Sequence, residues 1–313
     1  MRRDALSDFA ADVRVGLSGS GQKWLPARWL YDDLGSALFE AITVLPEYGL
    51  TRADERVIAR LSPELPAWLP GALRVAEFGS GSGRKTAGLL RALPQRPTYH
   101  PIDVSTAALV ACTRELAEIT TVVPEAADYD AGLTRVLAQR ASHERLLLLF
   151  LGSTIGNASP AEALAFLRST RGRLRPGDAL LLGADLVKDV ATLITAYDDP
   201  TGVTAAFNRN VLGRINRELG ADFDLANFAH EARYERDAQR IEMHLRARSA
   251  ARIAIPGAGL TIELAPGETL WTESSHKFTE RGIDRLVAEA GWLSAQRWID
   301  PVWAFAETLL LVP

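Results

Sequence analysis

Sulfur and imidazole ligands are scarce in this chain. Its 313 residues include one cysteine, Cys112, and five scattered histidines. A single thiol excludes an internal disulfide and a multi-thiolate zinc site, and the histidines lack metal-ligand spacing, so we expect no metal. Cys112 lies in an apolar helical pattern, which favours a buried structural thiol over a nucleophile.

Long apolar runs and a strong charge are also missing. The longest apolar run, 146–152, is too short to cross a bilayer. A net charge of −4 offers no polybasic field for nucleic acid or an anionic membrane. The first residues are polar rather than the apolar core of a signal peptide. We therefore expect a cytoplasmic monomer that binds neither nucleic acid nor membrane.

The most informative stretch that is present spans residues 75–86. An apolar, strand-like run carries Glu77 near its end and then meets Gly79, Gly81 and Gly83 before a helical segment. Glycine lets the backbone approach a ligand closely, and a strand, a glycine turn and a helix N-terminus form a nucleotide-type pocket. The third glycine comes one residue too early for a dinucleotide fingerprint. The pattern acid-x-G-x-G-x-G therefore favours S-adenosylmethionine over a pyrophosphate.

The chain alternates strand-like and helix-like segments, which predicts a doubly wound α/β sheet. This alternation stops after residue 187 and resumes only with a helix and a terminal strand near the end of the sequence. We expect a catalytic domain at 57–187 and 277–313, interrupted by an accessory domain made of 1–56 and 188–276. The expected strands are 73–78, 98–103, 120–124, 145–151, 178–185, 240–245, 251–255 and 303–312; the expected helices are 86–93, 105–119, 161–173, 204–219 and 279–290.

Several polar residues follow the predicted strands. Asp103 lies about 20 residues beyond the glycine turn, where an acid typically binds ribose hydroxyls, although it could instead cap a helix. Asp128 and Tyr129 fit an adenine clamp, with a solvated loop acid as the equal alternative for Asp128. Lys85 is placed to face the cofactor's carboxylate or to be a surface charge.

Asn157 follows the buried strand 145–151. Ligands of open α/β sheets bind at the carboxyl ends of the strands, so Asn157 is a candidate near the reacting centre. The alternative is that Asn157 caps the helix that begins near Ser159.

Seven stretches, in order along nearly the whole chain, make it recognisable. The chain resembles the histidine Nα-methyltransferases of ergothioneine biosynthesis, which make trimethylhistidine (hercynine). The matching stretches are WLYDDLGS (29–36), LPEY (45–48), FLGSTIGN (150–157), GADLVKD (183–189), AYDD (196–199), GVTAAFNRN (202–210) and TESSHKF (272–278).

The resemblance implies a class I methyltransferase fold (α/β, Rossmann-like, with a seven-stranded sheet) and an inserted α+β accessory domain that contributes the amino-acid pocket. It implies that L-histidine is the substrate and S-adenosyl-L-methionine the cofactor. Asn157 and Tyr197 would hold the histidine carboxylate, Glu273 and Ser275 would take the imidazole, and Tyr31 would lie by the α-amino group as the catalytic residue. The full sets are, for substrate, Tyr31, Tyr48, Asn157, Tyr197, Met243, Glu273 and Ser275, and, for cofactor, Gly79, Lys85, Asp103, Asp128 and Tyr129.

The residues alone leave other interpretations open. Met243 would suit an ordinary core contact, and Glu273 an ordinary surface carboxylate. The chain departs from the family pattern at Gly49-Leu50 and at Gly83-Arg84. The competing functions are a methyltransferase acting on another amino acid such as tryptophan, a nicotinamide oxidoreductase, and a non-catalytic S-adenosylmethionine-binding module.

Overall fold

The computed structural model describes residues 3–313. Met1 and Arg2, part of the predicted accessory domain, lie outside this range. The chain divides into two compact units, which we describe separately. Unit 1 comprises residues up to Gly49 together with Lys188–His276, and unit 2 comprises Leu50–Val187 together with Lys277–Pro313.

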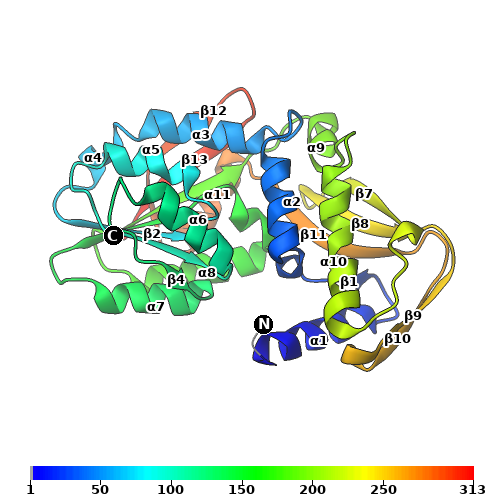
Figure 1. Ribbon diagram of the computed structural model, residues 1–313. Coiled ribbons are helices and arrows are strands. Elements are labelled where there is room, and N and C mark those ends of the chain that lie inside the picture. The colour runs from blue at the N-terminus through cyan, green and yellow to red at the C-terminus, as the bar shows by residue number, and fades with distance from the viewer. Residues whose placement is uncertain (1–2) are drawn as a thin grey trace. The chain divides into compact units, whose positions relative to one another are not determined.

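Unit 2 contains a mixed sheet of seven strands flanked by helices (Figure 1). Its strands are β2 (Leu73–Phe78), β3 (Tyr99–Asp103), β4 (Glu125–Ala126), β5 (Arg145–Phe150), β6 (Ala179–Asp185), β12 (Leu293–Asp300) and β13 (Phe305–Leu311). Its helices are α3 (Leu50–Leu61), α4 (Leu65–Trp68), α5 (Arg84–Ala92), α6 (Thr106–Leu116), α7 (Tyr129–Gln139), the 3-10 turn η2 (Thr154–Asn157), α8 (Pro160–Arg173) and α11 (Glu280–Glu289).

The strand order of this sheet is β12-β13-β6-β5-β2-β3-β4. The first strand of this sheet, β2, lies in its interior. Strands β3 and β4 follow on one side of β2, and β5, β6, β13 and β12 lie on the other side. Strand β13 lies between β6 and β12 and is antiparallel to both, while β2 pairs in parallel with β3 and β5. This arrangement confirms the predicted seven-stranded class I methyltransferase fold.

Side chains alternate between the two faces of the sheet, as strand geometry requires. Ala76, Phe78 and Leu148 belong to the core cluster that contains Leu133 of α7 and Ile283 of α11. The residues between them in sequence face the opposite layer, to which α3, α5 and α6 belong; α3 packs against α5 and β13. Both layers bury apolar strands, which explains why β5 is nearly continuous leucine.

Unit 1 combines helices with a four-stranded sheet of order β1-β11-β8-β7 and a β9-β10 hairpin. Its helices are α1 (Arg3–Leu17), η1 (Ala27–Leu30), α2 (Asp33–Thr43), α9 (Val190–Tyr197), α10 (Val203–Leu219), η3 (Leu225–Asn227) and η4 (Pro256–Ala258). Its strands are β1 (Lys23–Trp24), β7 (Phe228–Glu235), β8 (Arg240–Ala247), β9 (Ala251–Ile255), β10 (Leu260–Leu264) and β11 (Thr269–His276).

Polar side chains of α10 tie the N-terminal segment to the rest of unit 1. Asp32 caps α2 by accepting from the Gly35 amide, and it also accepts from Asn210 Nδ2 at 2.6 Å. Arg214 donates to the Trp29 carbonyl at 3.0 Å. Helices α2 and α10 lie side by side as a result (Figure 1).

Two sequence predictions differ from the structure. The strand expected at 120–124 is wrong: Val122 forms only an isolated bridge with Tyr99, and the strand is Glu125–Ala126. Pro124 has no amide hydrogen to donate to a ladder, so the pairing with β3 is interrupted between the Val122 bridge and Glu125. The domain boundary expected after residue 56 falls after Gly49, because Leu50–Leu61 is one helix that packs on α5 and β13.

Two helical glycines of unit 2 provide a stability test with an internal control. A Cβ on Gly132 of α7 would lie 2.3 Å from Cγ2 of Ile102, whereas a Cβ on Gly88 of α5 meets nothing within 4 Å. Gly132→Ala should lower the free energy of unfolding by about 1–3 kcal/mol through overpacking. Gly88→Ala should raise it by about 0.5–1 kcal/mol, because alanine suits a helix interior.

Urea unfolding of both variants, followed by circular dichroism, measures the two changes. Equal shifts in the same direction would contradict the packing of α7 on β3.

Candidate functional site: a cofactor turn and an amino-acid pocket

The glycine turn follows β2 directly and opens α5. Gly79, Gly81 and Gly83 have φ values of 65°, 52° and 73°, a left-handed conformation that L side chains rarely adopt. A Cβ on Gly79 would lie 2.9 Å from the hydroxyl oxygen of Tyr129. Gly83 is the N-cap of α5 and provides no side chain for the first amides of that helix. The turn therefore leaves backbone and a helix N-terminus available to a ligand.

Asp103 ends β3 beside this turn. Its Oδ1 accepts from the Ser105 amide at 2.8 Å, and its Oδ2 accepts from the Gly81 amide at 3.4 Å. Burial raises the pKa of Asp103, although amide hydrogen bonds oppose the shift. Ser105 caps α6, so the predicted alternative that Asp103 caps this helix is wrong. A carboxylate next to the glycine turn suits two ribose hydroxyls.

Asp128 and Tyr129 begin α7. Asp128 is exposed and caps the helix by accepting from the Ala131 amide at 2.8 Å, which leaves its second oxygen for another donor. The Tyr129 ring packs on Phe78, with centroids 4.8 Å apart, and on Phe150 at 5.8 Å. Burial raises the pKa of Tyr129, so its hydroxyl stays neutral. The glycine turn, the ribose-type acid and this ring fit S-adenosylmethionine.

Lys85, in the first turn of α5, is not a simple surface charge. Its Nζ donates to Asp54 Oδ2 of α3 at 2.6 Å; the Asp54 side chain is fully buried, and 28% of the Lys85 side chain is exposed. Burial opposes the charge of Lys85, but Asp54 and nearby glutamates outweigh it and raise its pKa. The Lys85 side chain is therefore anchored by Asp54 and partly exposed, which suits a residue that binds an anion.

Glu77 lies on β2 under the glycine turn and is fully buried. Its Oε2 accepts from Thr86 Oγ1 at 2.6 Å and from the Tyr99 hydroxyl. Burial raises the pKa of Glu77 to about 7, because the hydroxyl donors and Lys85 offset only part of the desolvation.

Asn157 belongs to unit 2 and ends the 3-10 turn η2, which follows β5. It is exposed. Ser159, not Asn157, caps α8, in a capping box with Glu162. The predicted alternative role of Asn157 as a helix cap is thus wrong, and its side chain is available for a ligand at the carboxyl end of the parallel strands.

The remaining predicted substrate residues all lie in unit 1. Glu273 of β11 is 8% exposed, and the Tyr31 hydroxyl donates to its Oε1 at 3.4 Å. Met243 of β8 is directly opposite Glu273 in the antiparallel ladder, beside a register shift between Trp271 and Glu273. Glu273 is therefore not an ordinary surface carboxylate, while the burial of Met243 suits a pocket wall and a core contact equally.

The side chains of Ser275 and Tyr197 form a hydrogen bond with each other. The Tyr197 hydroxyl donates to Ser275 Oγ at 2.8 Å. The Tyr48 ring meets the Tyr197 ring edge-on, with centroids 6.0 Å apart. Tyr31 packs edge-on against Phe39 at 5.5 Å and Phe207 at 5.3 Å. Burial, together with the charge of Glu273, raises the pKa of Tyr31 and keeps its hydroxyl protonated.

Sequence reasoning missed Asp54, Phe207 and Phe39. A signal for Asp54 was available: it occupies the apolar stripe of α3, whose other members are Leu50, Ala53, Val57, Ile58 and Leu61. A charge on the buried face of an amphipathic helix needs a partner, and Lys85 is that partner. No comparable signal marks the two phenylalanines, since aromatic residues are common in cores.

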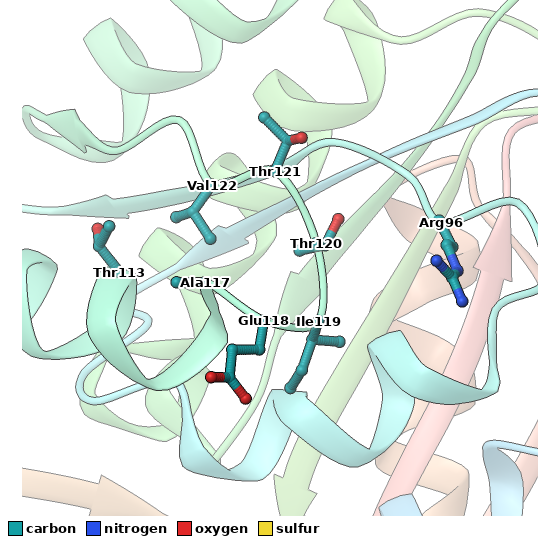
Figure 2. Close-up of a pocket in the computed structure, with 8 residues that line it drawn as sticks. All are labelled: Arg96, Thr113, Ala117, Glu118, Ile119, Thr120, Thr121 and Val122. Atoms are coloured by element: carbon teal, nitrogen blue, oxygen red, sulfur yellow. The ribbon is translucent and has the colours of Figure 1, made fainter.

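A hollow on unit 2 lies elsewhere. Figure 2 shows its eight lining residues, which come from the end of α6 and the segment leading to β4, with Arg96 to one side. Thr121 bonds to Tyr99 at the amino end of β3, whereas Asp103 and the glycine turn are at the carboxyl end. None of the predicted ligand residues lines this hollow.

The described residues also bear on metals and membranes. Within residues 3–313, His, Cys, Asp and Glu side chains form no cluster that could hold a metal ion. Over the same range, each helix is too short or too polar to serve as a membrane span.

The strand order and the glycine turn define an S-adenosylmethionine-dependent methyltransferase. The family model of histidine-specific, S-adenosylmethionine-dependent methyltransferases matches residues 9–312, and the chain belongs to this family.

Among known proteins, the chain is 42% identical over 304 residues to the histidine N-alpha-methyltransferase of Mycolicibacterium smegmatis, covering 95% of this chain and 93% of that protein. It is 43% identical over 307 residues to the enzyme of the same name from Mycobacterium tuberculosis, with the same coverages. It is 28% identical to the ergothioneine biosynthesis protein 1 of Neurospora crassa, over 89% of this chain and 32% of that protein.

The raised pKa of Glu77 predicts a pH effect on stability. A carboxyl group that binds its proton more tightly in the folded state makes the fold less stable as the pH rises from the unfolded value of 4.5 to about 7. Relative to Glu77→Gln, whose amide oxygen still accepts from Thr86 and Tyr99, the wild type should lose up to about 3 kcal/mol of unfolding free energy over this interval.

Denaturant melts of both proteins across this pH range measure the difference. Parallel stability curves would mean that Glu77 titrates like an exposed carboxyl group.

Proposed function

We propose that the protein transfers methyl groups from S-adenosylmethionine to the α-amino group of L-histidine, up to trimethylhistidine (hercynine), in ergothioneine biosynthesis. The observation that carries the proposal is the buried carboxylate Glu273, which lies opposite Met243 and accepts from Tyr31. Membership of the family and the named relatives support it.

In this proposal Glu273 selects the ring of the substrate. An imidazole N–H satisfies the carboxylate, whereas an apolar amino acid would leave it buried and unpaired at a cost of about 1–3 kcal/mol or more. Met243 forms the apolar wall beside the ring. Ser275 contacts the second ring nitrogen. Its hydroxyl lies 2.8 Å from that of Tyr197 and can donate to it, which frees the single hydroxyl hydrogen of Tyr197 for the carboxylate of the substrate.

Tyr31 acts at the amine. The ammonium form of the substrate must lose a proton to solvent before it can attack, since the α-amino group of a peptide titrates near ~7.7–8.0 and that of a free amino acid higher. A neutral Tyr31 hydroxyl, held protonated by burial and by Glu273, orients the amine lone pair rather than acting as a phenolate base. The rings of Tyr31 and Tyr48 offer faces to the quaternary ammonium that forms.

The cofactor supplies an already activated methyl group on a sulfonium. The chain contributes alignment and water exclusion. Gly79 lets the backbone approach the cofactor, Asp103 accepts from the ribose, and Lys85 pairs with the carboxylate. Asp128 and Tyr129 bind the adenine, and Asn157 with Tyr197 holds the carboxylate of histidine.

The proposal also covers the compartment in which the protein acts, its oligomeric state and its independence of nucleic acid. We take the protein to be a cytoplasmic monomer that requires no nucleic acid. Light scattering of the purified protein measures the oligomeric state, and a stable dimer would overturn that part alone.

Glu273→Gln tests whether Glu273 recognises the imidazole ring of the substrate. The amide oxygen still accepts a hydrogen bond but has no charge, so kcat/KM for histidine should fall about tenfold or more, mainly through KM. The Kd of S-adenosylhomocysteine, measured calorimetrically, should not change. Glu263→Gln, an exposed site on β10, is the matched control. An unchanged KM would remove Glu273 from the substrate pocket.

Tyr31→Phe tests the role at the amine. Without the hydroxyl, the proportions of mono-, di- and trimethylated products should shift, which mass spectrometry of the reaction mixture resolves. Tyr234→Phe on β7 is the control. Product ratios identical to the wild type would show that Tyr31 does not govern the amine.

The same assay separates the rival functions. A mass increase on tryptophan but not on histidine would indicate a different amino-acid methyltransferase, and no increase on any amino acid would leave only a binding module.

A further inference from the structure

Unit 2 contains a cluster of three buried carboxyl groups around one lysine, Lys85, whose single positive charge can neutralise only one of them. Asp54, Glu77 and Glu307 are each at most 2% exposed and lie around Lys85. If all three carboxyl groups were ionised, the cluster would bury an excess of negative charge, which costs several kcal/mol per unpaired ion. At least one of these acids must therefore remain neutral or find a proton donor.

Glu307 is the acid with the fewest donors. It lies on β13, on the sheet face that meets α3, and its register partners on β6 and β12 are Gly183 and Trp298, which carry no charge. Neither of its oxygens has a hydrogen-bond donor among the described residues, and both are buried. By contrast, Glu77 accepts from Thr86 and Tyr99.

One polar partner of Glu307 is another acid, Asp54. The carboxyl group of Glu307 lies within hydrogen-bonding reach of Asp54. Asp54 Oδ2 is used by Lys85, whereas Asp54 Oδ1 is buried and has no donor among the described residues. Two facing carboxyl groups can form a hydrogen bond only if one of them carries a proton. Such a proton would join Asp54 Oδ1 to one of the two carboxyl oxygens of Glu307.

Burial raises the pKa of Glu307 well above its ordinary value, and the charge of Asp54 adds to this effect while Lys85 opposes it. Glu77 is the remaining titratable group nearby, and it also raises the pKa of Glu307. The proton therefore belongs on Glu307, while Asp54 keeps the charge that pairs with Lys85.

Glycine makes room for this arrangement. A Cβ on Gly183 would lie 2.6 Å from Glu307 Oε1, and a Cβ on Gly152 would lie 3.1 Å from Lys85 Nζ. Only hydrogen atoms at these positions let the acid and the ammonium approach the strand ends. Gly183 on β6 and Gly152 after β5 therefore leave the space that the Glu307 and Lys85 side chains occupy.

We propose that Glu307 is a positioning residue that stays a neutral carboxylic acid and donates a hydrogen bond to Asp54 Oδ1. Asp54 then holds Lys85 in one place, where its exposed side meets the carboxylate of S-adenosylmethionine. This rests on the proposed role of Lys85 in cofactor binding. Ionisation of Glu307 at alkaline pH would add negative charge next to the incoming carboxylate and weaken binding.

The test compares Glu307→Gln, Glu307→Ala and the wild type by calorimetric titration with S-adenosylhomocysteine from neutral to alkaline pH. The Gln amide donates as the acid does, so its Kd at neutral pH should stay within about twofold of the wild type. Glu307→Ala leaves Asp54 without a donor and should weaken binding about tenfold. Wild-type affinity should fall with rising pH more steeply than that of Glu307→Gln.

Infrared difference spectroscopy tests the proton without using the cofactor and remains decisive if Glu307→Ala does not fold. At a pH well above 7, where Glu77 is ionised, the wild type should show the carbonyl band of a protonated carboxylic acid that disappears in Glu307→Gln. The band should survive in Glu77→Gln and in the exposed control Glu289→Gln. Absence of that band, or a Kd for Glu307→Gln as weak as that of Glu307→Ala, would overturn the proposal. Unchanged binding in Lys85→Met would instead refute the role of Lys85, with the band intact.

Discussion

The ion pair between Lys85 and Asp54 joins two helices of unit 2 beside the glycine turn. It links α5, which follows that turn, to α3, and Lys85 Nζ lies close to Gly152 after β5. A buried pair of this kind is costly to assemble but still costlier to break, because removing one partner leaves an uncompensated charge. The other residues that we propose bind the cofactor lie at or just after the ends of β2, β3 and β4, at the same edge of the sheet as this pair.

Unit 1 also buries a carboxylate within a strand. Glu273 lies in the interior of β11, with Met243 opposite. The hydroxyl oxygen of the neighbouring Thr272 lies 2.6 Å from Asn208 Oδ1 and 2.9 Å from the Met243 carbonyl oxygen, and its single hydrogen is shared between these two acceptors. These bonds tie the sheet to α10 and fix the register on which the facing side chains depend. A strand interior is more rigid than a loop, which suits the role in ring recognition that we propose for Glu273.

Much of the architecture was predictable from periodicity. The strands at 73–78, 145–150 and 179–185 were located to within a residue or two, because continuous apolar runs between turn signals leave few alternatives. Strands β7, β10, β11 and β12 were not located. The partly exposed residues of β7 and β12 lack a clear alternation. Family resemblance, not physics, supplied Glu273 and Tyr31 as candidates, because the side chains that surround them come from distant segments. Their mutual contact spans 242 positions of sequence.

Charged residues inside apolar patterns were the signal that local reasoning left unused. Asp54 interrupts the buried stripe of α3, and Glu307 interrupts a strand that is otherwise almost wholly apolar. Either residue alone looks like a defect, because an isolated buried carboxylate destabilises a fold. Together with Lys85 they form a set in which one cation, one anion and one neutral acid satisfy one another. Since no local pattern connects residues 54, 85 and 307, only the folded sheet reveals that each acid is tolerated because of the other two groups.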